Sequence, residues 1–129
     1  MIPEAEVLAP LWPHLERCAP AEGCAVLLCG PSGGRLHLMK NVAAAGFAFD
    51  DGEWLALQRA ARLGGEQVAW IIHSHVDCAP SLSAEDRASA RLHPGVDWLV
   101  VSLREGRVDA CALHRGAGGS RVSGGLGRP

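Results

Sequence analysis

The sequence lacks the features that mark membrane, secreted or nucleic-acid-binding proteins. Its uncharged stretches, such as Gly23 to Gly34 and Asn41 to Phe49, fall well short of the ~20 apolar residues that a membrane-spanning helix needs. The N-terminus lacks the positive flank and long apolar core of a secretory signal. Twelve basic residues mixed with fourteen acidic ones form no basic patch for phosphate backbones or anionic lipids. We therefore expect a cytoplasmic protein with no nucleic-acid partner and no membrane partner.

The five cysteines form no Cys-x-x-Cys pair, which argues against a structural zinc knuckle or a redox couple. Their number is odd, and free thiols are the expectation. With 129 residues, 48% of them hydrophobic, the chain is long enough for one domain that buries roughly two thirds of its surface. Such a domain needs no metal merely to remain folded, so any metal that it binds should have a function.

Helical periodicity predicts three helices, over residues 4–18, 50–63 and 83–91. In the first helix, apolar residues recur at three- and four-residue steps, and Pro10 and Pro13 are expected to kink or split it. The second begins at a cluster of acidic residues and stops at two glycines. The third begins at a serine that two acidic residues closely follow.

Strand patterns predict five strands, over residues 23–30, 35–42, 68–72, 97–103 and 107–114. The first and third are almost wholly apolar, as expected for strands that are buried on both faces. The second is the returning partner of the first, and the last two form a hairpin. From His73 onward apolar patterning stops, and a loop is expected. Because helices alternate with strands, we expect an α/β domain with one mixed β-sheet.

The last fourteen residues, Gly116 to Pro129, are rich in glycine and poor in large apolar side chains. They are predicted to be a flexible tail or a segment that docks late, which leaves residues 1–115 as the folded domain. Three tryptophans, Trp54, Trp70 and Trp98, fall on apolar faces and are expected in the core, whereas the place of Trp12 is open.

Two histidines after the third predicted strand are the strongest candidates for a reactive site. Side chains two residues apart in an extended segment point the same way, so His73 and His75 can direct two imidazoles at one point. Asp86, in the first turn of the next helix, can add a carboxylate. Two imidazoles, one carboxylate and a position left for water form the ligand set of a catalytic zinc site. Hydrolysis also needs a proton shuttle, and Glu22, at the head of the first apolar strand, is the candidate.

These residues resemble the signature of the JAMM (MPN-plus) zinc metalloproteases. Glu22 is followed at a distance by His73-Ser-His75, seven residues, Ser83, two residues and Asp86. This spacing is similar to the family pattern Glu, then His-x-His-x(7)-Ser-x-x-Asp, at every position. The resemblance extends roughly from Pro20 to His114 and includes the order of helices and strands.

The resemblance implies a fold, a site and an activity. The fold is a three-layer, cytidine-deaminase-like α/β domain with one mixed β-sheet between helices. The ligands of one zinc ion would be His73, His75 and Asp86. Glu22 would act as general base and general acid, and Ser83 would stabilise the oxyanion. The activity is hydrolysis of a peptide or isopeptide bond after the C-terminal Gly-Gly of a ubiquitin-like protein.

For small stand-alone bacterial members, the family implies a β-grasp sulfur-carrier protein as the substrate. The chain could also form a homodimer. It departs from many relatives at position 76, where they have proline after the second histidine, and at Cys78. These departures leave the metal motif intact and the choice of substrate open. We expect Cys78 to be a packed small side chain; the sharper alternative is a thiolate that reaches the zinc and holds the enzyme inactive.

Other interpretations of the same residues compete with this one. Taken alone, Ser83 and Asp86 are close to a helix capping box. Two histidines and a carboxylate also hold iron in non-haem oxygenases, although those usually sit on all-strand double sheets. An amidohydrolase barrel needs about 200 residues or more and is excluded by length. The rival from another class is a non-catalytic MPN-type interaction scaffold. The remaining histidines, expected to be structural or exposed, are His14, His37, His93 and His114.

Overall fold

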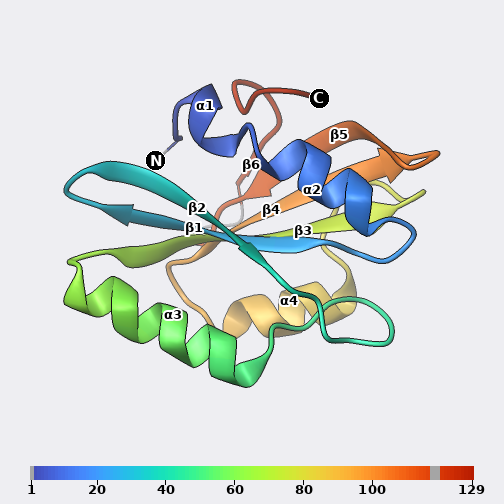
Figure 1. Ribbon diagram of the computed structural model, residues 1–129. Coiled ribbons are helices and arrows are strands. Elements are labelled where there is room, and N and C mark those ends of the chain that lie inside the picture. The colour runs from blue at the N-terminus through green and yellow to red at the C-terminus, as the bar shows by residue number, and fades with distance from the viewer. Residues whose placement is uncertain (1, 117–119) are drawn as a thin grey trace.

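A mixed six-stranded β-sheet with helices on both faces organises the described part of the chain (Figure 1). The computed structural model describes residues 2–116 and 120–129. The strands are β1 (Cys24–Gly30), β2 (Gly33–Met39), β3 (Gln67–Val76), β4 (Asp97–Arg104), β5 (Arg107–His114) and β6 (Arg121–Val122). The helices are α1 (Ala5–Leu8), α2 (Leu11–Cys18), α3 (Asp51–Leu63) and α4 (Ala84–Arg91). Within the described ranges, no helix is long and apolar enough to cross a membrane.

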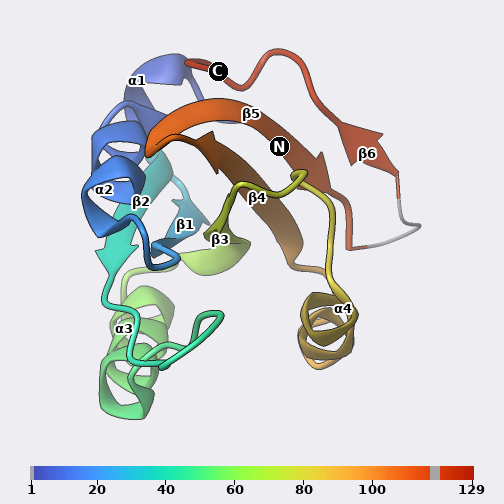
Figure 2. The same cartoon turned by 90° about the vertical axis from the view of Figure 1, so that its right-hand side faces the viewer.

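The sheet has the order β2-β1-β3-β4-β5-β6, and β3 and β4 run parallel while the other neighbours are antiparallel. Helices α1 and α2 cover one face, and α3 and α4 lie on the other (Figure 2). The prediction of an α/β domain with one mixed sheet between helices is therefore confirmed.

The first predicted helix is split at Pro10, as its two prolines suggested. Pro10 is the N-cap of α2, where its missing N–H removes no intrahelical hydrogen bond. Pro13 is tolerated for the same reason, because it lies in the first turn of α2. Both helices therefore pack apolar side chains on the sheet, and Leu8, Leu11 and Leu15 are fully buried.

Strand β3 is longer than the sequence suggested and corrects the prediction of a loop from His73. The strand runs to Val76 because its backbone pairs with β4 over its whole second half, ending at Val76 opposite Leu103. Side-chain polarity does not end a strand while its main-chain groups still have a partner strand, and for the last residues of β3 that partner is β4. His73 and Ser74 are fully buried, so the polar residues lie inside the sheet and not in a loop. Strand β2 ends earlier than predicted, and beyond it Asn41 makes only an isolated bridge with Phe49.

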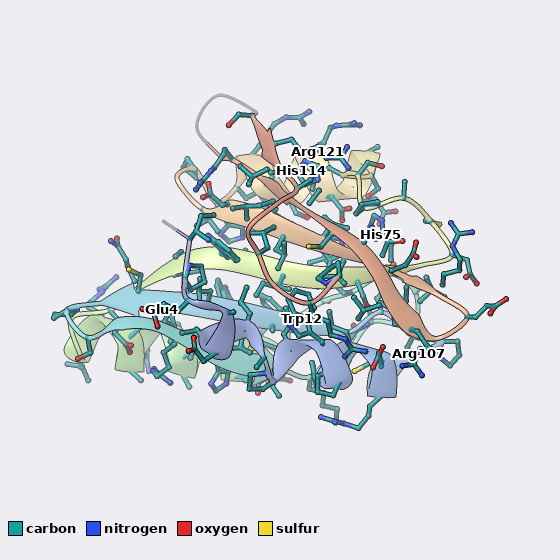
Figure 3. All side chains as sticks on the ribbon, turned by 90° about the horizontal axis from the view of Figure 1, so that it is seen from above. Glu4, Trp12, His75, Arg107, His114 and Arg121 are labelled. Carbon is teal, nitrogen blue, oxygen red and sulfur yellow. The ribbon has the colours of Figure 1, made fainter. Side chains whose placement is uncertain are left out.

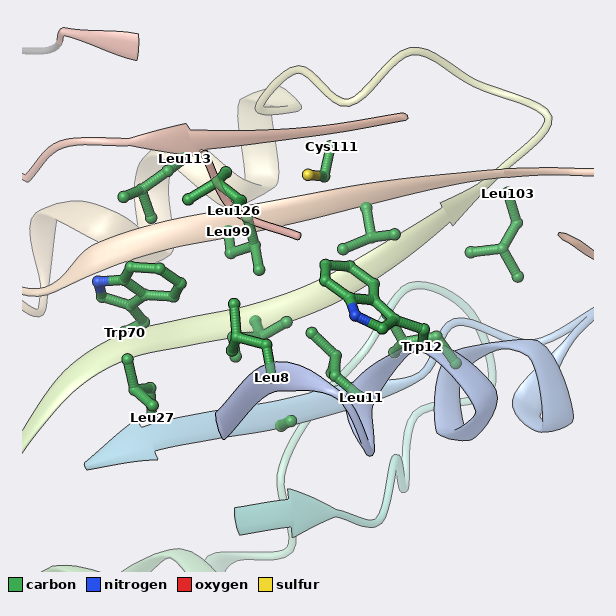
Figure 4. Packing of buried hydrophobic residues seen from close by; sticks show 14 residues of the cluster. Leu8, Leu11, Trp12, Leu27, Trp70, Leu99, Leu103, Cys111, Leu113 and Leu126 are labelled. Atoms are coloured by element: carbon green, nitrogen blue, oxygen red, sulfur yellow. The ribbon is translucent and has the colours of Figure 1, made fainter. Parts of the chain in front are cut away.

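Two hydrophobic clusters hold the helices to the sheet. The larger lies under α1 and α2 and includes Trp12, Trp70 and the leucines labelled in Figure 4. Burying one large apolar side chain stabilises a fold by about 1.5–3 kcal/mol, so this cluster is the main source of stability. The smaller cluster lies between the sheet and α3, and Trp54 packs against it only partly buried. Trp98 is buried, as predicted, and Trp12, whose place was open, belongs to the core.

The described part of the C-terminal segment docks on the core, which is one of the two interpretations that the sequence left open for it. Strand β6 pairs with the end of β5, and the chain then returns across the sheet towards Trp12 (Figure 3). Leu126 is 2% exposed and belongs to the larger cluster. Residues 117–119 lie outside the described residues, and the flexibility of the tail stays a prediction.

Candidate metal centre

Sheet register brings the predicted site residues together at one end of β3. In the pairing of β1 with β3, Cys24 lies opposite His73. The next pair is closed by two hydrogen bonds: Ser74 N donates to Gly23 O over 3.0 Å, and Gly23 N donates to Ser74 Oγ over 2.8 Å. Glu22, just before β1, is thereby held beside the two histidines although it is far from them in sequence.

Three side-chain atoms converge on one point. The Nε2 atoms of His73 and His75 are 3.1 Å apart. Asp86 Oδ2, from the first turn of α4, lies 3.1 Å from His73 Nε2 and 3.2 Å from His75 Nε2. Glu22 is adjacent: one ligand atom each of Glu22, His73 and His75 lie within 4.8 Å of one another. The structure therefore brings together the four residues whose side chains were expected to meet.

The hydrogen bonds of His75 show that a proton or a cation belongs between its Nε2 atom and Asp86. His75 Nδ1 lies 3.0 Å from the carbonyl oxygen of Ala79, which can only accept, so Nδ1 carries the hydrogen. In the neutral ring Nε2 then presents a lone pair, and it faces the carboxylate oxygen of Asp86. Two lone pairs 3.2 Å apart require a proton or a cation between them.

The geometry fits zinc. A tetrahedral ion with ligands at about 2.0 Å has ligand atoms about 3.3 Å apart, close to the three observed separations. Imidazole nitrogen and carboxylate oxygen are ordinary zinc donors. The carbonyl of Ala79, which orients His75, is the kind of outer partner that metal-bound histidines have. His73 is held differently: its ring stacks on Phe47 at 4.4 Å between centroids, and its buried Nδ1 has no hydrogen-bond partner in the described structure.

Burial and hydrogen bonds shift the acid–base properties of these groups in opposite directions. Burial raises the pKa of the Glu22 carboxyl, which favours a group that can carry a proton. Burial would also raise the pKa of Asp86, but hydrogen bonds from His73 and His75 outweigh it and hold that pKa well below its usual range. The hydrogen bond with Asp86 raises the pKa of His75 in the metal-free site. The pKa of Asp86 is thus lowered and that of Glu22 raised, so Glu22 is the carboxyl that takes up a proton more readily.

Ser83 is the N-cap of α4 and completes a reciprocal capping box with Asp86. Its Oγ accepts the backbone N–H of Asp86 over 3.0 Å, and its own N–H donates to Asp86 Oδ2 over 3.0 Å. Ser83 also lines the pocket, together with Glu22, His75 and Asp86. The hydroxyl hydrogen is not used by the cap and remains able to donate into the pocket.

A pocket of about 830 Å³ opens over the site, and sequence reasoning missed the loop that forms one of its walls. That loop, residues 42–48, is held by the side chain of Asn41. Asn41 Nδ2 donates to the carbonyls of Glu22 and Gly46 over 2.8 and 2.9 Å, while Oδ1 accepts the N–H groups of Ala43 and Ala48. The sequence signal was only an asparagine at the start of an apolar stretch.

The structure contradicts the expectation for Cys78 and shows where three of the other histidines lie. Cys78 is exposed and lines the pocket, so the expectation of a packed side chain was wrong. His14 has a structural place, with Nε2 3.1 Å from the carbonyl of Cys24. His93 lines the site pocket and meets Trp54 edge-on, which the sequence did not indicate. His114 contacts the loop that carries Ala79, through the carbonyl of Pro80 at 2.9 Å.

Comparison with known proteins identifies similar domains. The family model Prok-JAB, described as prokaryotic homologs of the JAB domain, matches residues 4–113. A solution structure of a Salinibacter ruber protein is similar over 100% of this chain and 92% of its own, with a TM-score of 0.68 and 27% identity. One of a Desulfitobacterium hafniense protein is similar over 95% and 89%, with a TM-score of 0.67 and 23% identity. No curated protein matches the chain.

Proposed function

The chain belongs to the family of prokaryotic homologs of the JAB domain, and on this basis we propose that it is a zinc-dependent peptidase of the JAMM type. We propose further that it acts in the cytoplasm on the C-terminal Gly-Gly of a small ubiquitin-like sulfur-carrier protein. One observation carries the proposal: the Nε2 atoms of His73 and His75 and Oδ2 of Asp86 lie 3.1–3.2 Å from one another, with the lone pair of His75 facing the carboxylate.

His73, His75 and Asp86 would hold the zinc ion, and the other groups of the site would handle protons and charge. Bound zinc supplies a water molecule whose pKa is lowered to about 7 and polarises a carbonyl oxygen. Glu22 would take the proton from the attacking water on its carboxylate and pass it to the leaving amine nitrogen. Its raised pKa supports this role, because the protonated form is then accessible during the reaction. The free hydroxyl hydrogen of Ser83 would donate to the substrate's carbonyl oxygen.

The walls of the pocket support glycine at the cleaved end of the substrate. The loop wall is made mostly of small residues, namely Ala43, Ala44, Ala45, Gly46 and Ala48, together with Phe47. Ser83 and Ala84, at the start of α4, also line the pocket. An extended Gly-Gly segment has no side chains to clash with either wall, and its amide groups can bond to backbone at an exposed edge. Whether the bond is peptide or isopeptide is an outcome of the assay.

Metal content is the first test of this function. Wild-type protein purified without added zinc should contain about one zinc per chain by elemental analysis, and His75→Ala should contain almost none. His37→Ala is the matched control, because His37 is on edge strand β2 and does not line the site pocket. Absence of zinc from the wild type even after reconstitution would refute the proposed activity.

Cleavage is the second test and separates an enzyme from a scaffold. The substrate is a sulfur-carrier protein fused through its C-terminal Gly-Gly to a reporter, in peptide and isopeptide forms. Glu22→Gln should keep the zinc and abolish cleavage, because an amide cannot accept the proton. If zinc-loaded wild type cuts neither form and the biological role survives Glu22→Gln, a non-catalytic interaction scaffold is the better description.

A further inference from the structure

Three consecutive carbonyl groups in the exposed loop after β3 each accept a hydrogen bond from a different strand. Ser102 Oγ on β4 donates to the carbonyl of Cys78 over 2.6 Å. His75 Nδ1 on β3 donates to Ala79 over 3.0 Å. His114 Nε2 on β5 donates to Pro80 over 2.9 Å. The middle carbonyl is therefore the partner of a candidate zinc ligand, and the carbonyls on both sides of it are tied to the sheet.

The loop has little else to hold it in place. Asp77 has a positive φ of 54°, and Cys78 and Ala79 are exposed. Besides the three bonds to consecutive carbonyls, a backbone bond from Asp77 N to Leu103 O over 2.7 Å and a bond from Glu105 N to Asp77 Oδ1 over 3.4 Å join the start of the loop to the end of β4 and the turn after it. An unrestrained carbonyl in an exposed loop would bond to water as well as to His75. The orientation of the His75 ring therefore depends on the bonds that flank Ala79.

Strand pairing places Ser102 where its side chain can hold the loop after β3. It lies opposite His75 in the parallel pairing of β3 with β4, and it is only 6% exposed. The pairing of β4 with β5 is irregular between Ser102 and Leu103, and such a bulge re-aims side chains at the edge of a site. Ser102 Oγ thus lies close enough to the loop to donate to the carbonyl of Cys78.

His114 holds the loop at the residue that follows Ala79, through the carbonyl of Pro80. Because a carbonyl can only accept, the hydrogen of the neutral His114 ring is on Nε2. His114 lies at the end of β5, opposite Trp98 of β4, and is half-buried. Trp98 lines the site pocket and meets His73 edge-on at 5.8 Å, so the same strand pair borders both candidate histidine ligands.

We propose that Ser102 and His114 are positioning residues for the metal centre, which they serve by holding the loop carbonyl that orients His75. This inference rests on the proposed function, since it presupposes that His75 is a zinc ligand. Neither residue belongs to the His-x-His-x(7)-Ser-x-x-Asp motif, and neither touches the three converging atoms. Both act on the tautomer and angle of His75, through its hydrogen bond to Ala79.

The test measures metal binding and not turnover. The dissociation constant for Zn²⁺ is obtained by competition with a chromophoric chelator, and the visible spectrum of the Co²⁺-substituted protein reports ligand geometry. The double variant Ser102→Ala/His114→Leu should bind Zn²⁺ about tenfold or more weakly and show a changed Co²⁺ spectrum, as outer-partner losses do. Ser102→Ala/His114→Gln keeps a donor towards Pro80 and should recover part of the loss.

The matched control is Ser32→Ala/His37→Leu, which removes the same groups from the β1–β2 turn and from β2. It should bind Zn²⁺ and Co²⁺ as the wild type does. Thermal unfolding of the metal-free proteins distinguishes a structural role from a positioning role. A structural role would lower stability without changing the dissociation constant or the spectrum. If the double variant does not fold, the single variant Ser102→Ala serves as the test, because it deletes only one oxygen atom and should fold.

The outcomes distinguish this inference from the proposed function. Zn²⁺ binding that is equally weak in the wild type and in His75→Ala would overturn the proposed function and this inference together. Tight binding that depends on His75 but is unaffected by Ser102→Ala and by the double variant would overturn this inference alone. A loss of equal size in the control variant would also overturn it.

Discussion

Asp86 Oδ2 accepts the backbone N–H of Ser83 over 3.0 Å, and the same oxygen atom lies 3.1 Å from His73 Nε2. One atom therefore belongs both to the cap of α4 and to the converging donor set. The two interpretations that the sequence allowed for Ser83 and Asp86, a capping box and a metal site, are not alternatives. The cap holds the carboxylate in place without a metal, which would reduce the ordering that binding of the proposed zinc ion requires.

Asp86→Asn should separate these two roles. The side-chain carbonyl of asparagine can still accept the N–H of Ser83, so α4 should remain capped. The neutral amide is a much poorer zinc donor, and we expect Zn²⁺ affinity to fall by about 100-fold or more. Circular dichroism and chelator competition measure the two effects. Asp51→Asn, which is exposed in the first turn of α3 and does not line the pocket, is the control, and equal Zn²⁺ affinity of Asp86→Asn and wild type would show that Asp86 is not a ligand.

Asn41→Ala should impair cleavage without removing zinc. Asn41 holds the carbonyl of Glu22 and the loop at the pocket wall but contributes no atom to the converging set. A displacement of about 1 Å at a catalytic group can cost about 100-fold in rate, so we expect kcat/KM to fall at least tenfold. Elemental analysis should still find about one zinc per chain. Unchanged cleavage would mean that the loop and Glu22 keep their places without this side chain.

Leu126→Ala tests the docking of the C-terminal segment. Truncation of a buried leucine costs about 2–5 kcal/mol, and Leu126 is buried in the larger cluster. Urea unfolding at neutral pH should show a loss in this range. Leu63→Ala is the matched control, because Leu63 is 90% exposed at the end of α3 and its truncation should change stability by less than about 0.5 kcal/mol. Equal, small effects would mean that the segment does not dock in solution.

Glu16→Gln should lower stability at neutral pH and lose its effect in acid. Glu16 Oε2 accepts the N–H of Val108 and an N–H of Arg128, both over 2.9 Å, and these bonds lower its pKa, the Val108 bond most strongly. A carboxyl with a lowered folded-state pKa stabilises the fold above its ordinary pKa and ceases to do so as pH falls through the lowered value. The Glu16 carboxylate is partly exposed, and its pair with Arg128 lies at the surface, so the difference should be at most about 1 kcal/mol.

The measurement for Glu16 is urea unfolding of both proteins between pH 3 and pH 7. The stability gap should be full near pH 6 and should shrink below about pH 4.5, the ordinary pKa of glutamate. A gap that stays constant down to the acid end would contradict a role for the charged carboxylate.

Local patterns predicted the elements well and their ends less well. Apolar spacing indicated the central strands and the helices, because those residues face the core. It failed at the end of β3, where His73, Ser74 and His75 continue a strand whose backbone partners on β4 are far away in sequence. It also failed for Leu126, since one apolar residue among glycines forms no periodic pattern.

What the sequence by itself determined is the local part of the site. A two-residue step along a strand makes His73 and His75 point the same way, and a serine and an acid three residues apart make a capped helix that presents Asp86. Only the tertiary structure decided that Glu22 stands beside them, because this depends on the register of β1 against β3. The same holds for Asn41, Ser102 and His114. Their partners include backbone carbonyls, which are alike in every residue and leave no signal in the sequence.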